Sequence, residues 1–281
     1  MNATFVGIIA PLSWSLLPLI TFNLKHLDPF LILVYSFLIF NIIEFLRQAL
    51  TKSIINPLTI PNSYYLNGLI GVFGFHLCYF LALRMAPIMP VYLIVNTTSI
   101  FIIFYSKLFN NLDIRPNHIF ACLINFSAVG LIASSKASEA FELKHLFGYF
   151  LALLAANAWA IYSVKNKLFD VPLRATNYPI FLSAILSLFA YIFYIEEIDF
   201  SFSVNDFYLL LLLGLFPIGY SFYMWIYGIT NGDIRLLSII AFINPVFGTI
   251  WLTIAGIEEF NWVLVISIIL IISGTFIARS K

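Results

Sequence analysis

Residues 146–165 read LFGYFLALLAANAWAIYSVK, a run of apolar and small residues in which Lys165, at the end, is the charged side chain. An α-helix rises about 1.5 Å per residue, so a helix of this length covers the hydrocarbon core of a bilayer, about 30 Å. We therefore predict that this stretch crosses a membrane.

Nine other stretches have the same character, and each is bounded by polar residues, proline or glycine. They run Thr4–Phe22, Pro29–Leu50, Tyr64–Arg84, Ile88–Phe109, Asn117–Ser135, Asn177–Ile195, Asp206–Gly228, Arg235–Gly256 and Asn261–Ala278. Ten spans of about 20 residues each leave only short connections in a chain of 281 residues. The predicted fold class is an all-α integral membrane protein with ten transmembrane helices.

The composition agrees with this fold class and excludes several others. Hydrophobic residues make up 62% of the chain and charged residues 10%, whereas soluble domains average about 45–50% and about 25%. The 18% of aromatic residues and the two cysteines exclude a disordered chain and a disulfide-rich secreted scaffold. A net charge of +1 argues against a nucleic-acid partner. The expected partners are the lipid bilayer and a small-molecule substrate, with the chain acting as a monomer or weak homodimer.

The distribution of lysine and arginine predicts the orientation, because cytoplasmic connections hold an excess of them. Ten lie on the side of the two termini, namely Arg47, Lys52, Lys107, Arg115, Lys165, Lys167, Arg174, Arg235, Arg279 and Lys281. The other side has four, Lys25, Arg84, Lys136 and Lys144, together with the acidic residues Glu196, Glu197, Asp199, Glu258 and Glu259. We expect a multi-pass inner-membrane protein with both termini in the cytoplasm and with the first apolar stretch retained.

A weak internal repeat divides the chain into two halves. Ala10-Pro-Leu-Ser-Trp14-Ser in the first span matches Ala155-Ala-Asn-Ala-Trp159-Ala in the sixth, 145 positions later. Each half has five spans, an odd number, so the second half must enter the membrane from the opposite face. We predict two inverted five-helix repeats, residues 1–137 and 146–281, an arrangement that secondary transporters use to place a substrate site near the midplane.

The chain resembles the EamA-type, ten-helix branch of the drug/metabolite transporter superfamily, and within it the aromatic amino acid exporters. The resemblance rests on the strings Val6-Gly-Ile-Ile-Ala-x-x-x-Trp14-Ser, Tyr149-Phe-Leu-Ala-x-x-x-Ala-x-x-Trp159-Ala-x-Tyr162-Ser-x-x-Asn166-Lys167 and Asn244-Pro245-Val-Phe247. It implies alternating-access transport of small amphiphilic metabolites, neutral or aromatic amino acids first among them, by an exporter or facilitator. Other solutes, such as S-adenosylmethionine or a nucleotide-derived metabolite, are the alternative substrates. The chain departs from the family at Asn96-Thr97-Thr98-Ser99, where the fourth helix of the family usually has a proline.

Few ionisable groups fall inside the spans, where a charge costs roughly 2.5–3.5 kcal/mol on insertion scales. Glu44 and Arg84 lie toward span ends, and we expect both to reach water. His76 lies near a midplane, where it either relays a proton or serves as a neutral hydrogen-bonding ring. The second reading is favoured, and the lack of a central carboxylate favours a facilitator over a proton antiporter.

Aromatic and amide side chains about ten residues from the span ends are the candidate substrate contacts. They are Trp14, His76, Tyr79, Asn96, Trp159, Tyr162, Tyr220, Tyr223 and Asn244. Flat rings with a polar tip suit an amphiphilic ligand, although the same residue types also form interfacial belts and bond helices together. Candidate kinks or hinges are Pro11, Pro18, Pro217, Gly219 and Pro245, while Gly68, Gly71 and Gly74 predict close helix packing.

No catalytic or cofactor motif is present. The sequence has no His-Glu-x-x-His, no Gly-x-Ser-x-Gly and no phosphate-binding loop. We therefore expect neither an enzyme nor a cofactor or metal site. A channel is disfavoured because no filter or ring of charge is visible.

Overall fold

A computed structural model describes residues 2–136, 142–194 and 199–279, and these ranges contain helices and connections but no strand. Glu196, Glu197 and Lys281, which entered the charge count, lie outside the described residues, as do the side chains of Lys136 and Arg279. Within the described ranges nine helical stretches are long and apolar enough to cross a membrane, and a tenth, Trp262–Ala278, is shorter. The ten-helix, all-α prediction is confirmed.

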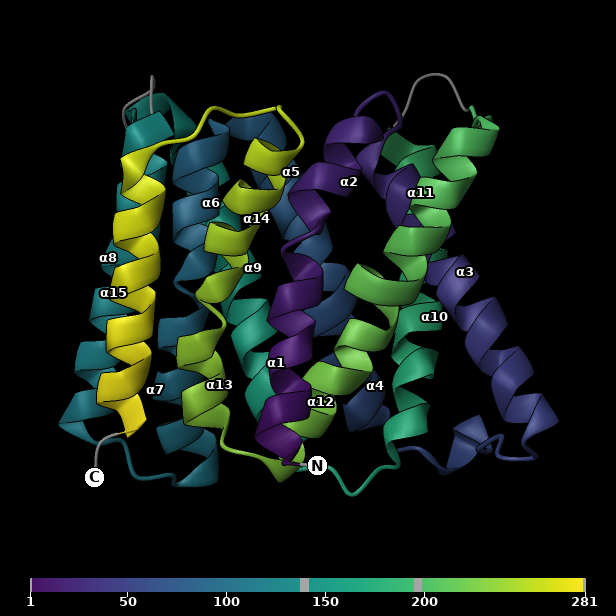
Figure 1. Ribbon diagram of the computed structural model, residues 1–281. Helices are drawn as coiled ribbons and strands as arrows, with labels where there is room; N and C mark the ends of the chain where they lie inside the picture. Colours follow the sequence, from purple (N-terminus) through teal and green to yellow (C-terminus); the bar gives the residue numbers. More distant parts are fainter. Residues whose placement is uncertain (1, 137–141, 195–198, 280–281) are drawn as a thin grey trace.

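Five spans precede residue 137 and five follow residue 141 (Figure 1). The first five are α1 (Ala3–Trp14) with α2 (Leu17–Asn23), α3 (Pro29–Leu50), α4 (Asn62–Leu69) with η2 (Ile70–Gly74) and α5 (Phe75–Met85), α6 (Ile88–Asn96) with α7 (Thr98–Asn110), and α8 (Pro116–Lys136). The second five are α9 (Leu146–Asn166), α10 (Asn177–Tyr194), α11 (Val204–Leu215) with η5 (Phe216–Tyr220) and α12 (Ser221–Asn231), α13 (Ile234–Ile240) with α14 (Ile243–Ile254), and α15 (Trp262–Arg279). Short 3-10 turns η1 (Pro57–Thr59), η3 (Leu143–His145) and η4 (Leu173–Thr176) lie in the connections.

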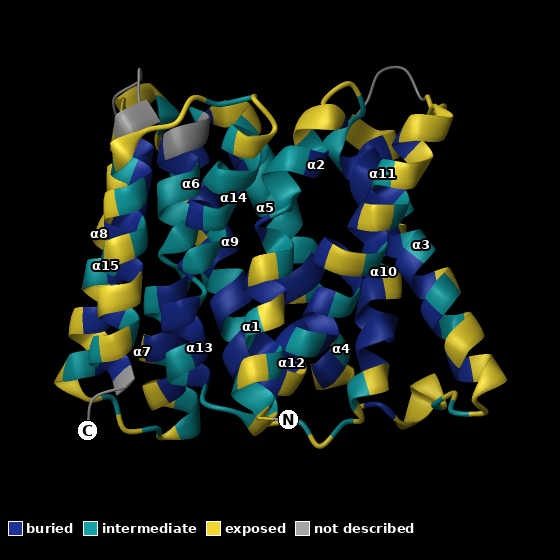
Figure 2. Ribbon diagram, viewed as in Figure 1, coloured by how far each residue is buried: buried dark blue, intermediate teal, exposed yellow. Residues whose placement is uncertain are grey.

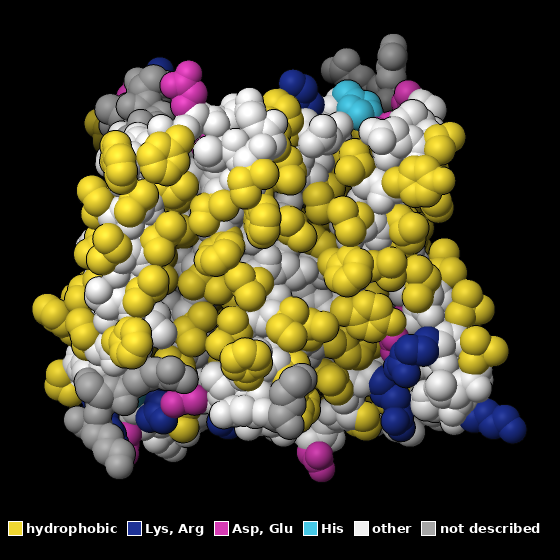
Figure 3. Space-filling model, viewed as in Figure 1, with side chains coloured by type: hydrophobic (Ala, Val, Ile, Leu, Met, Phe, Trp, Pro, Cys, Tyr) yellow, Lys and Arg dark blue, Asp and Glu magenta, His cyan; other side chains and the backbone are white. Residues whose placement is uncertain are grey.

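Both ends of the chain lie on one face of the bundle, which we call the terminus face (Figure 1). Hydrophobic side chains cover the middle of the visible surface, and charged side chains gather toward its two ends (Figure 3). This distribution suits a molecule whose waist lies in lipid and whose ends lie in water.

Local residue chemistry fixes where several helices start. Asp28 caps α3 by accepting a hydrogen bond of 2.8 Å from the backbone N–H of Phe30, and Pro29 takes the first helical position. Ser203 and Asp206 form a capping box at the start of α11. The helices therefore begin within two or three residues of the boundaries that the apolar pattern predicted.

Breaks interrupt the spans near the predicted prolines. The first span breaks between Trp14 and Leu17, just before Pro18, and the eighth passes through a π-helical turn that holds Pro217 and Gly219. The ninth breaks at 241–242, before Pro245. Pro11, in contrast, stays inside α1 and does not end it.

The third and fourth spans carry matching breaks that the sequence did not predict. The π-helical turn η2 in the third span lies 146 residues before η5, at Ile70–Gly74 against Phe216–Tyr220. The fourth span breaks at Thr97, and the ninth breaks about 145 residues later. No proline lies within η2, whereas η5 holds Pro217.

The helix contacts of the two halves also correspond. The first span packs against the eighth and ninth, and the sixth packs against the third and fourth. α3 packs against α10, and α8 against α15. Exchanging each span of the first half with its counterpart in the second half, five spans later, therefore reproduces the same set of helix contacts.

Glycines allow the closest of these contacts. A Cβ at Gly68 would collide with Pro179, and one at Gly71 would collide with the ring of Tyr162. At Gly74 the nearest neighbour is the Leu69 carbonyl, at 3.6 Å. The prediction of close helix packing therefore holds for Gly68, which joins the third span to the seventh, and for Gly71, which joins it to the sixth.

Packing is tighter toward the terminus face than toward the opposite face. Figure 2 shows buried residues gathered in the half of the bundle nearer the termini and partly exposed residues in the other half. In α12, which reaches the terminus face, seven of eleven residues are buried, whereas in α5, which reaches the opposite face, Ala82 alone is buried.

Candidate functional site

Five rings from four helices meet near the middle of the bundle and form what we call the central aromatic cluster. They are Trp14 from α1, Phe75 from α5, Trp159 from α9, and Phe222 and Trp225 from α12. Trp14 and Trp159 meet edge to face with ring centroids 5.4 Å apart. Phe75 lies 5.5 Å and Phe222 5.3 Å from Trp159. The cluster joins residues from both halves of the chain.

His76 and Tyr79 extend this cluster toward the face opposite the termini. Both are partly exposed, and Phe75 links them to Trp159 through centroid distances of 5.0 Å to His76 and 5.8 Å to Tyr79. Nδ1 of His76 lies 2.6 Å from the Val72 carbonyl oxygen. A carbonyl can only accept, so Nδ1 carries the proton and Nε2 of the neutral ring is left as an acceptor.

Some polar groups on these rings donate hydrogen bonds within the protein, and others have no partner among the described residues. Trp14 donates its indole N–H to Ser221 and Trp225 donates to Ser163, each at 2.9 Å. The indole N–H of Trp159 and the hydroxyl of Tyr79 have no hydrogen-bond partner among the described residues. Trp159 and Tyr79 are therefore the donors that remain for a ligand.

Tyr162 is packed more deeply than the other candidates. Its ring contacts Trp159 at 5.3 Å and lies against Gly71, and only 2% of the residue is exposed. Its hydroxyl is buried without a hydrogen-bond partner in the described part of the chain. Such a group is either an uncompensated cost or a contact completed by a ligand or water.

Tyr220 and Tyr223 lie on the terminus side of the cluster, beside Glu44. The two rings are 6.0 Å apart, and each meets Phe40 edge to face. Tyr220 donates a hydrogen bond of 3.4 Å to Glu44.

The expectation that Glu44 reaches water was wrong. Its side chain is 0% exposed because α3 packs against α10, α11 and η5, and donors from Arg47, Gln48 and Tyr220 replace water. Arg47 donates to both carboxylate oxygens, at 2.8 and 2.6 Å, and Gln48 donates at 2.8 Å. Arg84, by contrast, is partly exposed at the opposite face and pairs with Asp28.

Asn96 and Asn244 lie next to the breaks in the fourth and ninth spans. Asn96 donates to the Tyr92 carbonyl of its own helix at 2.8 Å. The side chain of Asn244 makes no hydrogen bond with any described residue. Ring contacts therefore join seven of the nine candidates into two adjoining groups, and the other two candidates are these amides, which have no ring.

Phe75, Phe222 and Trp225 are cluster members that the sequence reasoning missed. Phe222 and Trp225 are three residues apart and share one face of α12, which is the spacing of helix neighbours. Depth in the membrane selected Tyr220 and Tyr223 instead, because polar tips were sought. The spacing of Phe222 and Trp225 was the available sign that a second aromatic face existed.

Comparison with known proteins identifies the family. Residues 146–280 match the EamA-like transporter family. This half of the chain belongs to that family. The match begins with α9, which carries Trp159, and ends in α15. The resemblance to EamA-type drug/metabolite transporters is thereby confirmed, and the chain is a multi-pass membrane transporter.

Two relatives match over nearly the whole chain. It is 28% identical to the aromatic amino acid exporter YddG of Ancylobacter novellus, over 99% of this chain and 96% of that protein. It is 23% identical to an uncharacterized transporter of Archaeoglobus fulgidus, over 93% of this chain and 91% of that one. A solved crystal structure superposes with a TM-score of 0.92 at 27% identity, covering 98% of this chain and 97% of the other.

Proposed function

We propose that this transporter moves neutral amino acids, aromatic ones foremost, out of the cell by alternating access. The observation that carries the proposal is the central aromatic cluster, which presents rings from both halves and leaves the donors of Trp159 and Tyr79 unused. An aromatic side chain gains contact area and ring–ring attraction in such a site. The relative named as an aromatic amino acid exporter supports the same substrate class.

The two halves act, in this proposal, as inverted repeats, residues 1–137 and 146–281. The matched π-helical turns and the matched breaks in the fourth and ninth spans support this division. So does the correspondence of helix contacts between the halves. Repeats of this kind alternate access by moving one set of helices against the other.

Both termini lie in the cytoplasm in this proposal, because the lysine and arginine excess is on their face. The tighter packing near that face supports a conformation closed toward the cytoplasm and accessible from outside (Figure 2). Reporter fusions to each terminus test the orientation. Tails found in different compartments would overturn both the orientation and the inverted repeat.

S-Adenosylmethionine and nucleotide-derived solutes fit the site less well. A permanently cationic ligand calls for a carboxylate near the cluster. The described acidic side chains that are buried are Glu44, already paired with Arg47, and Asp206, which bonds Ser203 and lies beside His26. A neutral zwitterion with an apolar side chain needs no such group.

Purified protein in liposomes tests the substrate class. We expect exchange of labelled tryptophan, phenylalanine and other neutral amino acids against unlabelled amino acid inside. Trp159→Ala combined with Asn244→Ala should abolish exchange, whereas Trp262→Ala, at a side chain on the surface that is 73% exposed, should not. Unaltered exchange in the double variant would remove the proposed site.

A further inference from the structure

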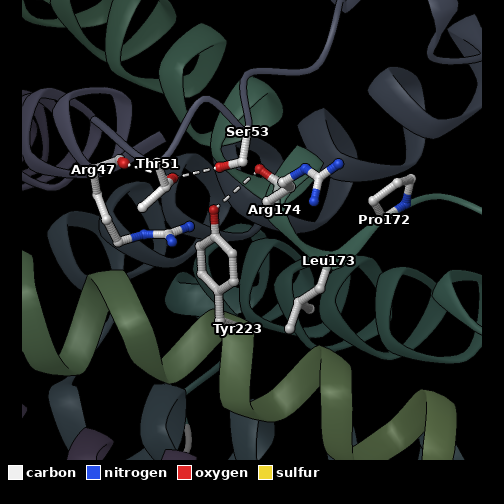
Figure 4. Close-up of a pocket in the computed structure, with 7 residues that line it drawn as sticks. All are labelled: Arg47, Thr51, Ser53, Pro172, Leu173, Arg174 and Tyr223. Atoms are coloured by element: carbon white, nitrogen blue, oxygen red, sulfur yellow. Dashed lines mark hydrogen bonds between the residues drawn. The ribbon is translucent and has the colours of Figure 1, made fainter. Parts of the chain in front are cut away.

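A pocket of about 450 Å³ lies among residues on the terminus side of the bundle, and none of the five rings of the central aromatic cluster lines it. Figure 4 shows the residues that line this pocket. Its walls come from three separate segments, and they are Arg47, Thr51 and Ser53 at the end of α3, Pro172, Leu173 and Arg174 before α10, and Tyr223 of α12. The volume lies within the range of small-molecule sites, roughly 300–1,000 Å³.

The polar groups in this pocket are predominantly donors, and it has no acidic wall residue. Arg47 gives two of its five N–H groups to Glu44, so three remain, and 46% of its side chain is exposed. The Glu44–Arg47 pair is neutral as a unit. The net positive charge therefore comes from Arg174, which is exposed and forms no ion pair with any described residue.

Hydrogen bonds hold the backbone of Arg174 in place, while its side chain has no ion pair among the described residues. Its carbonyl accepts hydrogen bonds from Gln48 at 3.1 Å and from Tyr223 at 3.2 Å. In Figure 4 the Arg174 side chain extends away from Tyr223, and the Arg47 guanidinium reaches toward it. Arg47 is thus a donor held in place by Glu44, and Arg174 is a long, exposed arm able to turn onto a bound anion.

Tyr223 connects this pocket to the proposed substrate path. It forms one wall of the pocket and meets Phe40 at 5.6 Å, and it follows directly after Phe222 of the central aromatic cluster. Tyr223 therefore belongs both to the pocket wall and to the tyrosine pair on the terminus side of the cluster.

We propose that this pocket is the cytoplasmic docking subsite for the α-carboxylate of the transported amino acid, with Arg47 and Arg174 as its donors. The inference rests on the proposed function, since it places the pocket on the side from which an exporter collects its substrate. Guanidinium groups match a carboxylate because each offers parallel N–H donors, and in this proposal the Arg174 side chain turns toward Arg47 when the carboxylate binds. Glu44 is a positioning residue that holds Arg47 at the wall.

Everted membrane vesicles, which present the terminus face outward, provide the test. We expect Arg174→Gln to raise the KM for tryptophan supplied at this face about tenfold with kcat unchanged. Arg174→Lys should lie between, because it keeps the charge and loses the planar fork. Arg115→Gln is the matched control, since it removes another exposed arginine from the same face that has no ion pair among the described residues.

Competition assays at this face test whether the pocket recognises the carboxylate or the ammonium group of tryptophan. Indole-3-propionate, which keeps the carboxylate, should compete with tryptophan better than tryptamine does in the wild type, and Arg174→Gln should erase this preference. Inorganic phosphate should compete poorly. Stronger competition by phosphate than by indole-3-propionate would overturn the assignment to a substrate carboxylate.

Liposomes of phosphatidylcholine alone exclude an anionic lipid headgroup as the occupant. If the Arg174→Gln effect persists there, the ligand is the substrate; if it requires phosphatidylglycerol, the inference is overturned. Equal KM values in Arg174→Gln and Arg115→Gln, with wild-type exchange intact, overturn the subsite alone. A wild type that exchanges no amino acid overturns the proposed function and the subsite with it.

Discussion

Trp14 and Trp159 meet edge to face at 5.4 Å, although 145 residues separate them in the chain. Each occupies the same place in the opening helix of its half. The ring of Trp14 is held by the hydrogen bond to Ser221, whereas Trp159 keeps its N–H unused. Two tryptophans that match in the sequence pattern therefore differ in hydrogen bonding, because the indole N–H of Trp14 has a partner within the described residues and that of Trp159 has none.

Trp159→Phe should lower aromatic amino acid exchange several-fold, and Trp159→Ala should lower it more than tenfold. The phenyl ring keeps the contact with Trp14 but loses the indole donor. Truncation of a buried tryptophan to alanine also costs about 3–5 kcal/mol of folding free energy, so the phenylalanine variant isolates the role in binding. Exchange in liposomes and thermal unfolding in detergent measure the two effects. Full activity in Trp159→Phe would mean that the donor is not used.

Gly71→Ala should destabilise the protein by about 1–3 kcal/mol, because its Cβ would collide with the ring of Tyr162. Gly130→Ala is the control, since nothing lies within 4 Å of a Cβ there. That change should leave stability equal or raise it by up to about 1 kcal/mol through helix propensity. Thermal unfolding in detergent compares the two, and equal behaviour would contradict the close approach of the third and sixth spans.

Arg47→Gln should destabilise the fold more than Glu44→Gln does. Loss of Arg47 leaves a carboxylate that is 0% exposed without its cation, at a cost of about 3 kcal/mol. Loss of the Glu44 charge leaves Arg47, whose side chain is 46% exposed and can be hydrated, so the cost is about 1 kcal/mol or less. Thermal unfolding of both variants measures this asymmetry, and the reverse order would show that Glu44 reaches water.

Transport should not be driven by a pH gradient. His76 is surrounded by Phe37, Phe75 and Phe80 and has no acidic partner among the described residues. A neutral ring that serves as an acceptor explains this setting without proton transfer. His76→Ala should weaken substrate affinity several-fold and leave the pH response flat, as measured by uptake into liposomes with an imposed gradient. Concentrative uptake in the wild type that is lost in His76→Ala would show instead that transport is coupled to protons through His76.

Asp233→Asn should remove a small, pH-dependent stabilisation at the start of α13. Burial raises the pKa of Asp233, but the hydrogen bonds and charge of Arg235 and the N–H of Leu236 outweigh burial and hold the pKa below its ordinary value. A lowered pKa gives stability that is present above the unfolded value, about 3.9, and is lost as the pH falls through the folded value. The difference between wild type and variant should stay under about 1 kcal/mol at neutral pH, because the carboxylate is partly exposed.

A thermal unfolding series measures this linkage. The gap between the two unfolding temperatures should close as the pH falls below about 4. A gap that widened toward acid pH would show that the carboxyl group is favoured in its protonated form.

The fold could be predicted from the sequence because lipid imposes a length on every apolar stretch. Pro29–Leu50 was predicted to the residue, and the other spans to within three residues. The π-helical turn at Ile70–Gly74 could not be predicted in this way, because an extra residue in a helical turn leaves hydropathy unchanged.

The sequence predicted how deep in the membrane the candidate site residues lie, but not which side of its helix each residue occupies. Depth selected Trp14, Trp159 and His76, which the structure joins through shared ring contacts. It also selected Asn96, whose side chain bonds back to its own helix, and Asn244. Hydropathy does not say which side of a helix faces inward. Glu44 was misread for the same reason, since neighbouring helices rather than its distance from the span end decide its access to water.

The contact between Gly7 and Gly228 limits how the two halves of the chain can move relative to each other. A Cβ at Gly7 would lie 3.0 Å from the Cα of Gly228, so α1 and α12 touch backbone to backbone. The third and sixth spans are joined by a contact of another kind, in which the side chain of Tyr162 lies against the backbone of Gly71. These contacts join the two halves of the chain along α1 with α12 and along the third span with the sixth, so a movement of one whole half against the other would have to break them.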